Sequence, residues 1–192
     1  MLAIDNLSVA YGAVQAVSAL DLTVDAGEVV ALLGPNGAGK SSTLRAASGL
    51  VPHAGTVTVD GAVVSDPVAA RRARVVHLPQ GRGLFRRLTV AQNLVLGAYG
   101  DAPGVARQAI TEAEGVIPEL QQWTGRRVGR LSGGEQALVA LGRLVVGRPR
   151  YALLDDGVRF VEGWFRDTLP VVASEIGPIA MLRLDGDLYE ST

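Results

Sequence analysis

The chain has 192 residues, of which 48% are hydrophobic and 19% charged, so it can bury the core of one domain with room for a subdomain. Its net charge of −1 and its lack of a basic stripe predict no nucleic-acid partner. Without cysteine it can form neither disulfides nor a Cys-ligated metal site. The sequence has no apolar run of about 18 residues and no signal-peptide pattern, so we expect a cytoplasmic protein with no direct membrane insertion.

Two segments near the start alternate apolar and polar residues, which is the period of half-buried antiparallel strands. They cover residues 2–9 and 19–24, and Tyr11 and Gly12 lie between them. The sequence therefore predicts two strands with an aromatic side chain at their connection. Tyr11 either packs within that turn or offers its ring to a flat ligand.

A glycine-rich segment, Gly-Pro-Asn-Gly-Ala-Gly-Lys-Ser at 34–41, follows the apolar run 28–33 and precedes a helix-permissive run at 42–48. Strand, glycine-rich loop and helix form the context in which G-x-x-x-x-G-K-[ST] is a P-loop, whose backbone N–H groups surround phosphate oxygens. The alternative is a β–α turn with a chance lysine. The predicted nucleotide-binding residues are Tyr11, Gly34, Asn36, Gly37, Ala38, Gly39, Lys40, Ser41 and Ser42.

Lys40 is the only lysine in the chain, and the other 17 of its 18 lysine and arginine residues are arginine. A compact ammonium group suits the β- and γ-phosphates better than a broad guanidinium group. Ser41 is the expected Mg²⁺ ligand of this motif. The guanine-reading N-K-x-D motif would need a second lysine, so ATP is the expected nucleotide, with Tyr11 stacking on its base.

Residues 54–64 predict a β-hairpin with an Asp-Gly turn, and 74–78 predict a strand that ends before Pro79. Gln80 follows this strand, where its amide could reach Mg²⁺ and an attacking water. We interpret His77 as a satisfied strand-end histidine and His53 as part of a solvated loop.

From residue 89 the apolar period becomes helical. Thr89 is the expected N-cap of a helix over 90–99, and 104–122 carry a second helical pattern that breaks near Pro118. The sequence therefore predicts an all-helical subdomain at 89–148.

Residues 131–136 read Leu-Ser-Gly-Gly-Glu-Gln and precede a helix that runs to about residue 146. Ser132 and the two glycines at that helix N-terminus form a second anion-binding nest. One chain with one nucleotide needs a single nest, unless the second serves a nucleotide held by another protomer.

The P-loop, Tyr11, Gln80 and the segment 131–136 together resemble the ATP-binding-cassette (ABC) ATPases over residues 1–150. The resemblance implies an α/β P-loop NTPase with a three-layer core, a small antiparallel β subdomain and a helical signature subdomain. It also implies that ATP and Mg²⁺ lie between one subunit's P-loop and the other subunit's signature residues. In this chain the signature residues are Ser132, Gly133, Gly134, Glu135 and Gln136.

Several segments resemble the ATPases of branched-chain amino-acid importers in particular. They are 79–82, 84–85, 88–90 with 93–94, and 94–99. This resemblance implies a subunit at the inner face of the cell membrane. It would pair with a second ABC ATPase subunit beneath a membrane permease and drive solute uptake by hydrolysing ATP. The amino-acid substrate is inherited by analogy only.

Beyond Arg150 the sequence departs from that family. Asp155 can supply the Mg²⁺-side carboxylate, with Ser41 and Gln80 as the other expected metal-site residues. Asp156 replaces the glutamate base and is one methylene shorter, and no switch histidine follows. A misplaced base forfeits part of the roughly 10²- to 10⁴-fold that such a group supplies. With Asp156 and Gln80 as the catalytic residues, we expect ATP binding with weak or no hydrolysis.

The tail, 151–192, resembles macrocin O-methyltransferases over 153–170 and 181–192, with Asp185 or Asp187 at a Mg²⁺ and sugar-hydroxyl position. The segment that binds S-adenosylmethionine in that family is missing, so we expect no methyl transfer. The chain is interpreted as a hybrid whose seam lies between Arg148 and Leu153. The alternative is a diverged ATPase tail.

The tail is expected to be a strand–helix–strand fragment of Rossmann-methyltransferase type. Strands over 151–155 and 179–185, with a crossover helix over 161–175, would fill two parallel positions of the ATPase sheet. Two functions remain open. One is a transport ATPase subunit with impaired turnover, and the other is a non-hydrolysing nucleotide-binding or remnant protein.

Overall fold

The computed structural model describes residues 1–155 and 180–185, the latter by their backbone alone. The described residues form two compact units. The first comprises residues 1–77, 150–155 and 180–185, and the second comprises residues 78–149. The expected helical subdomain, 89–148, therefore lies within the second unit.

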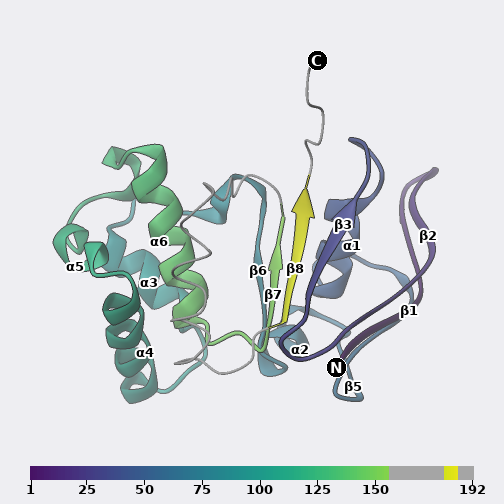
Figure 1. Ribbon diagram of the computed structural model, residues 1–192, viewed down its shortest axis with the longest axis horizontal. Coiled ribbons are helices and arrows are strands. Elements are labelled where there is room, and N and C mark those ends of the chain that lie inside the picture. The colour runs from purple at the N-terminus through teal and green to yellow at the C-terminus, as the bar shows by residue number, and fades with distance from the viewer. Residues whose placement is uncertain (156–179, 186–192) are drawn as a thin grey trace. The chain divides into compact units, whose positions relative to one another are not determined.

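The first unit contains an antiparallel sheet with the strand order β2-β1-β4-β5 (Figure 1). Its strands are β1 (Leu2–Tyr11), β2 (Val14–Val24), β4 (Ala54–Val59) and β5 (Ala62–Val63). The predicted strands 2–9 and 19–24 are present, but β2 begins five residues earlier. Ala19 has a φ of 46° and the register shifts on both sides of the Leu7–Leu20 pair, so the alternation in sequence is broken there.

The hairpin predicted over 54–64 is also present, as β4 and β5. Its two turn residues, Asp60 and Gly61, have φ values of 49° and 82°. Both central residues of a type I′ turn need a positive φ, and Asp-Gly is a preferred pair for this turn. The short-range sequence signal was sufficient to place this turn.

A second sheet in the described residues has the order β3-β8-β7-β6. Its strands are β3 (Val29–Leu33), β8 (Ala180–Asp185), β7 (Tyr151–Leu154) and β6 (Val75–Leu78). Strand β8, yellow in Figure 1, pairs in parallel with both β3 and β7. The expectation that the two tail strands fill parallel positions of the sheet is confirmed. The predicted crossover helix, 161–175, lies outside the described residues.

Two helices complete the described part of this unit, α1 (Lys40–Ala47) after β3 and α2 (Pro67–Arg72) before β6. The Asp66 side chain caps α2 by accepting two backbone N–H groups. Buried side chains from the antiparallel sheet, α1 and β7 form one hydrophobic cluster. It includes Leu2, Ile4, Val9, Leu44, Ala46, Val57, Tyr151 and Leu153. This core fixes α1 and, with it, the glycine-rich loop that precedes the helix.

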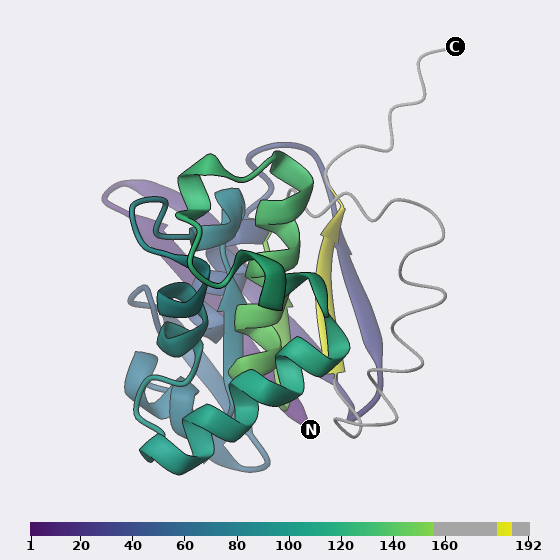
Figure 2. The same ribbon diagram turned by 90° about the vertical axis from the view of Figure 1, so that its left-hand side faces the viewer.

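The second unit is helical in its described residues, as the change of period predicted (Figure 2). Its elements are η1 (Gln80–Gly83), α3 (Val90–Gly97), α4 (Pro103–Val116), α5 (Glu119–Trp123), η2 (Val128–Arg130) and α6 (Gly133–Val146). Thr89 caps α3 in a capping box with Gln92. The break expected near Pro118 separates α4 from α5. This unit has its own core, which includes Val90, Leu94, Leu120, Val128, Val139 and Val146.

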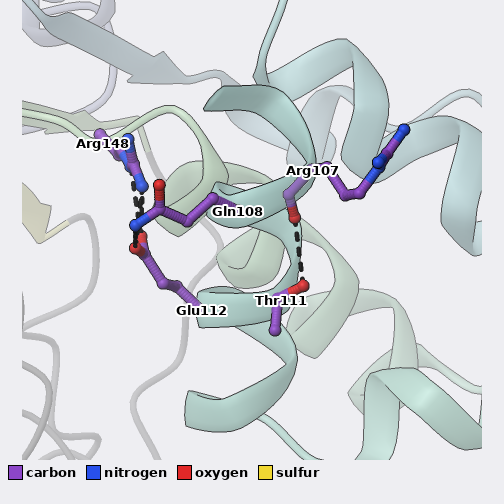
Figure 3. Close-up of polar contacts among 5 residues, drawn as sticks. All are labelled: Arg107, Gln108, Thr111, Glu112 and Arg148. Carbon is purple, nitrogen blue, oxygen red and sulfur yellow. Dashed lines mark hydrogen bonds and ion pairs between the residues drawn. The ribbon is translucent and has the colours of Figure 1, made fainter. Parts of the chain in front are cut away.

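An ion pair joins α4 to the chain just after α6 (Figure 3). Arg148 Nη2 donates to both Glu112 carboxylate oxygens at 2.8 Å, and Gln108 donates to Oε1 of the same carboxylate. Arg148 has a φ of 47°, a conformation that costs a side chain about 1–2 kcal/mol. A partly exposed pair is worth only about 0.2–1 kcal/mol. The ion pair therefore offsets part of the backbone strain at the end of α6.

Candidate functional site

Backbone conformation explains two glycines of the loop between β3 and α1. Gly37 and Gly39 both have a φ of 87°, in the region that favours glycine. A Cβ on Gly39 would lie 2.2 Å from the Ala16 carbonyl oxygen, whereas a Cβ on Gly37 would meet nothing within 4 Å. Gly39 is also the N-cap of α1 and carries no capping side chain. The first N–H groups of α1 are therefore available to an anion at this end of the helix.

The Lys40 ammonium group lies across the loop. Nζ donates to the Gly34 carbonyl at 2.6 Å and to the Pro35 carbonyl at 3.1 Å. An ammonium group has three donors, so these two bonds hold the charge at the loop and leave one donor for a further acceptor. Positive charge, glycine N–H groups and a helix N-terminus meet at one place. This combination suits a phosphate chain.

The structure brings together Ser41 and Asp155, which are 114 residues apart in the sequence. Ser41 Oγ, at the start of α1, donates to Asp155 Oδ1 at 2.7 Å, directly after β7. Asp155 is 2% exposed, and its Oδ2 has no hydrogen-bond partner among the described residues. A hydroxyl group and a carboxylate are hard oxygen donors, which Mg²⁺ prefers. An orphaned buried carboxylate oxygen next to the loop fits a cation at this place.

His77, from β6, also lies against Asp155. Its Nε2 is 4.0 Å from Asp155 Oδ2, and its Nδ1 is 3.1 Å from Ser48 Oγ. Burial lowers the pKa of His77 below its ordinary value. The Asp155 carboxylate acts in the opposite sense, and Arg45 lowers the pKa further. The interpretation of His77 as a satisfied strand-end histidine is right for Nδ1. It is wrong for Nε2, which has no hydrogen-bond partner in the described part of the chain.

The remaining residues predicted around the nucleotide lie in or near the same loop. Asn36, Gly37 and Ala38 are exposed, and Ser42 is half-buried in α1. Tyr11 ends β1 and is 45% exposed, so its ring is not packed away in its own turn. That exposure is compatible with a ring that faces a ligand, and both alternatives for Tyr11 stay predictions. Of the tail residues, Asp156 and Asp187 lie outside the described residues, and Asp185 ends β8.

The signature segment lies in the second unit and forms a capping box at the start of α6. The Ser132 backbone N–H donates to Glu135 Oε2 at 2.6 Å, and the Glu135 backbone N–H donates to Ser132 Oγ at 3.2 Å. The Ser132 backbone N–H is the largest cause that lowers the pKa of the Glu135 carboxyl, and the side chains of Ser132 and Arg126 lower it further. Gln136 Nε2 donates to the Leu131 carbonyl. The Glu135 carboxylate therefore takes up the Ser132 backbone N–H, and Gly133 and Gly134 form the first residues of α6.

Gln80 begins η1, also in the second unit. The same turn holds Arg82, whose φ of 69° is unusual for a side-chain-bearing residue. The Arg143 guanidinium group fixes this backbone by donating to the Arg82 and Gly83 carbonyls. Burial lowers the pKa of Arg143, although an arginine remains charged. No pattern in the sequence pointed to this half-buried arginine.

Comparison with protein families supports the arrangement of these motifs. The family model described as "ABC transporter" matches residues 17–159, which contain the P-loop, Gln80, the signature segment and Asp155. A second model, described as "Macrocin-O-methyltransferase (TylF)", matches residues 137–192. The two matches overlap at 137–159, and the expected seam between Arg148 and Leu153 lies inside that overlap. No relative or solved structure described below supports the second match.

Two curated relatives resemble the chain over most of its length. One is the high-affinity branched-chain amino acid transport ATP-binding protein BraG of Pseudomonas aeruginosa, 35% identical over 81% of this chain and 68% of that protein. The other is the phosphonates import ATP-binding protein PhnC of Hyphomonas neptunium, 36% identical over 82% of this chain and 66% of that protein. The chain thus spans about two thirds of each relative.

Solved structures share the fold. The crystal structure of a nucleotide-free ATP-binding cassette from an ABC transporter matches with a TM-score of 0.81 and 23% identity. The match covers 97% of this chain and 81% of that one. At this identity the likeness establishes the α/β P-loop fold, and the methyltransferase-type fragment is not confirmed by it. Within the described residues, no helix has the length and apolar character needed to cross a bilayer.

Proposed function

Because the chain belongs to the ABC transporter family of ATP-binding proteins, we propose that it binds Mg-ATP at residues 34–42 as the ATP-binding subunit of an importer. The observation that carries this proposal is the hydrogen bond from Ser41 to Asp155. It joins a P-loop serine to a buried carboxylate that follows β7, and β7 lies in the same sheet as β3, the strand before the P-loop. A chance glycine-rich turn has no reason to meet such a partner.

Each residue has a defined role in this proposal. Lys40 pairs with the β- and γ-phosphates, the loop N–H groups hold the phosphate oxygens, and Tyr11 stacks on the base. Ser41 and Asp155 hold Mg²⁺, which neutralises negative charge on the phosphates. The family resemblance assigns the metal-side amide to Gln80 and the general base to Asp156. Because Asp156 is one methylene shorter than the family's glutamate, its water would be badly placed and turnover slow.

The partners follow from the second nest. Ser132, Gly133, Gly134, Glu135 and Gln136 would meet the γ-phosphate of ATP bound to a second ABC subunit. The pair would work beneath a membrane permease, at the inner face of the cell membrane. Segments 79–99 and the likeness to BraG support branched-chain amino acids as the solute. The likeness to PhnC is comparable, and its name gives phosphonates as a second candidate solute.

A second candidate function is nucleotide binding without turnover, and the replaced residues after Asp155 favour it. The tail has Asp156 for the base and Gly157 for proline, and no histidine occurs beyond His77. We propose that the chain joins an ATPase segment, 1–150, to a methyltransferase-like tail, 151–192, that completes or flanks the sheet. Methyl transfer itself is not proposed, because the segment that would bind S-adenosylmethionine is missing.

An ATP-binding titration run beside a steady-state ATPase assay tests both candidates. The transport-subunit proposal predicts Mg-ATP binding with slow, Mg²⁺-dependent phosphate release. Binding with no release above a Lys40→Ala control would favour the non-hydrolysing alternative. The absence of ATP binding by the folded chain would contradict both.

A further inference from the structure

Four polar side chains form a continuous line beside α1 in the first unit. Ser48 Oγ lies 3.1 Å from His77 Nδ1, and His77 Nε2 lies 4.0 Å from Asp155 Oδ2. The other oxygen of that carboxylate, Oδ1, accepts the Ser41 hydroxyl at 2.7 Å. Ser41 and Ser48 are two helical turns apart and so share one face of α1. The line thus connects the end of α1 to the proposed metal site at its start.

The two side chains in the middle of this line are shielded from solvent. The side chains of His77 and Asp155 are 6% and 0% exposed. Within the described residues, His77 Nε2 and Asp155 Oδ2 both lack a hydrogen-bond partner. A buried carboxylate oxygen that has no hydrogen-bond donor destabilises the fold. This cost is larger than the cost of removing one of two hydrogen bonds from a neutral backbone carbonyl. The position of the imidazole proton therefore decides whether this contact is attractive.

Ser48 can set that position, because its hydroxyl has one hydrogen and three acceptors within reach. The acceptors are the Leu44 carbonyl at 2.8 Å, the Arg45 carbonyl at 3.1 Å and His77 Nδ1. If a carbonyl takes the hydrogen, the neutral imidazole carries its proton on Nδ1 and turns a lone pair toward the Asp155 carboxylate. If Nδ1 takes it, the imidazole proton sits on Nε2 and faces Oδ2. The Leu44 carbonyl still accepts the Ser48 backbone N–H at 3.0 Å, so the second arrangement leaves the carbonyl bonded.

We propose that His77, as the Nε2–H tautomer set by Ser48, is a positioning residue that donates to Asp155 Oδ2 and keeps Oδ1 toward Ser41 and the nucleotide-bound metal. This inference takes only the presence of the metal from the proposed function. The distance of 4.0 Å from His77 Nε2 to Asp155 Oδ2 exceeds a hydrogen bond by about 1 Å, so the proposed bond requires the two side chains to approach each other by that amount. Partners that hydrogen-bond a metal ligand typically change metal affinity about 10- to 100-fold.

The same three residue types form the nucleophilic triad of many hydrolases, but this arrangement serves another purpose. Ser48 is 5% exposed and caps the C-terminus of α1, with its hydroxyl against helix carbonyls. An attacking hydroxyl must reach its substrate, and this one is covered. The Ser48 hydroxyl is instead placed to fix the tautomer of His77.

The tautomer can be read directly. The chain has two histidines, His53 and His77, so imidazole ¹⁵N labelling gives two spin systems. The His77→Gln spectrum assigns them. In a two-bond ¹H–¹⁵N correlation recorded at about pH 8, where imidazoles are neutral, we expect His77 to carry its proton on Nε2. A proton on Nδ1 would overturn the inference whatever the chain binds.

Metal binding tests the consequence, with Mn²⁺ as the paramagnetic probe for Mg²⁺. His77→Leu removes the donor, whereas His77→Gln places an amide N–H near the position of Nε2. With ATP present, we expect Mn²⁺ affinity to fall about tenfold or more in His77→Leu and to stay within about threefold in His77→Gln. ATP affinity measured in EDTA should be unchanged in both. Equal Mn²⁺ affinity in His77→Leu and wild type would overturn the inference.

The role of His77 and the proposed function fail on different outcomes. A wild-type chain that binds ATP and Mn²⁺ while His77→Leu does so equally well contradicts only the role of His77. A folded wild-type chain that binds neither contradicts the proposed function, and the metal role of His77 with it. If His77→Leu does not fold, the tautomer measurement on the wild-type chain decides, and a loss of Mn²⁺ affinity of about tenfold in folded His77→Gln would also overturn the inference.

Discussion

Gly37 and Gly39 share a φ of 87° but differ in their surroundings, so they form a matched pair. An alanine at 37 would suffer only the left-handed strain, about 1–2 kcal/mol. An alanine at 39 would in addition place its Cβ 2.2 Å from the Ala16 carbonyl. Backbone cannot move aside cheaply, so we expect Gly39→Ala to cost about 3 kcal/mol or more. Denaturant unfolding of both variants measures this, and equal losses would contradict the packing argument.

At the residue scale, the sequence predicted those groups whose partners are close along the chain. The Asp60–Gly61 turn and the Thr89 cap needed only local rules. The approach of His77 to Asp155 was missed, because it depends on β6 and β7 lying in one sheet. Asp155 itself was found through the family resemblance and not through its chemistry. A single sequence therefore predicts local contacts better than contacts between distant strands.

At the element scale, the capping box of α6 carries a pH dependence. The folded chain holds the pKa of Glu135 below its ordinary value, so this carboxylate stabilises the fold above the unfolded pKa of about 4.3. The stabilisation is lost as the pH falls through the folded pKa. A glutamine at this position would keep an oxygen for the Ser132 N–H but would not titrate. We therefore expect the unfolding midpoint of Glu135→Gln to fall less steeply between about pH 5 and pH 3 than that of wild type. Parallel profiles would show that this carboxyl is not coupled to folding.

The periodicity of the sequence predicted where strands and helices form, but it did not predict which of their side chains are buried. The apolar run at 28–33 predicted a strand, which is β3. Val29 and Leu33 of that strand are nevertheless 63% and 65% exposed, because they lie on the open face of β3, whereas Val30 and Leu32 on the other face pack against the core. In parallel sheets helices usually cover both faces. A sequence pattern marks a residue as apolar but cannot tell which face is covered.

At the scale of the whole molecule, turnover should be limited by the replaced tail. Asp156→Glu restores the longer base and leaves the switch histidine and the loop after Asp156 unchanged. Groups that act as a unit are strongly non-additive, so we expect the single variant to stay within about tenfold of wild type, or ~1.4 kcal/mol in barrier. A chimera that continues after Arg150 with a complete importer-ATPase tail should hydrolyse ATP far faster. A steady-state ATPase assay compares the three chains, and full recovery by Asp156→Glu alone would refute the unit argument.

We expect the Lys40 ammonium group on the glycine-rich loop to hold the phosphates of ATP. Isothermal titration with Mg-ATP tests it most directly, using Lys40→Ala, Lys40→Arg and, as a control at the far end of α1, Arg45→Ala. One hydrogen bond to a charged group is worth about 1.5–3 kcal/mol, so we expect Lys40→Ala to lose about 10- to 100-fold in affinity. Lys40→Arg should not restore it, and Arg45→Ala should bind like wild type. Unchanged ATP affinity in a folded Lys40→Ala chain would show that the Lys40 ammonium group does not bind the phosphates.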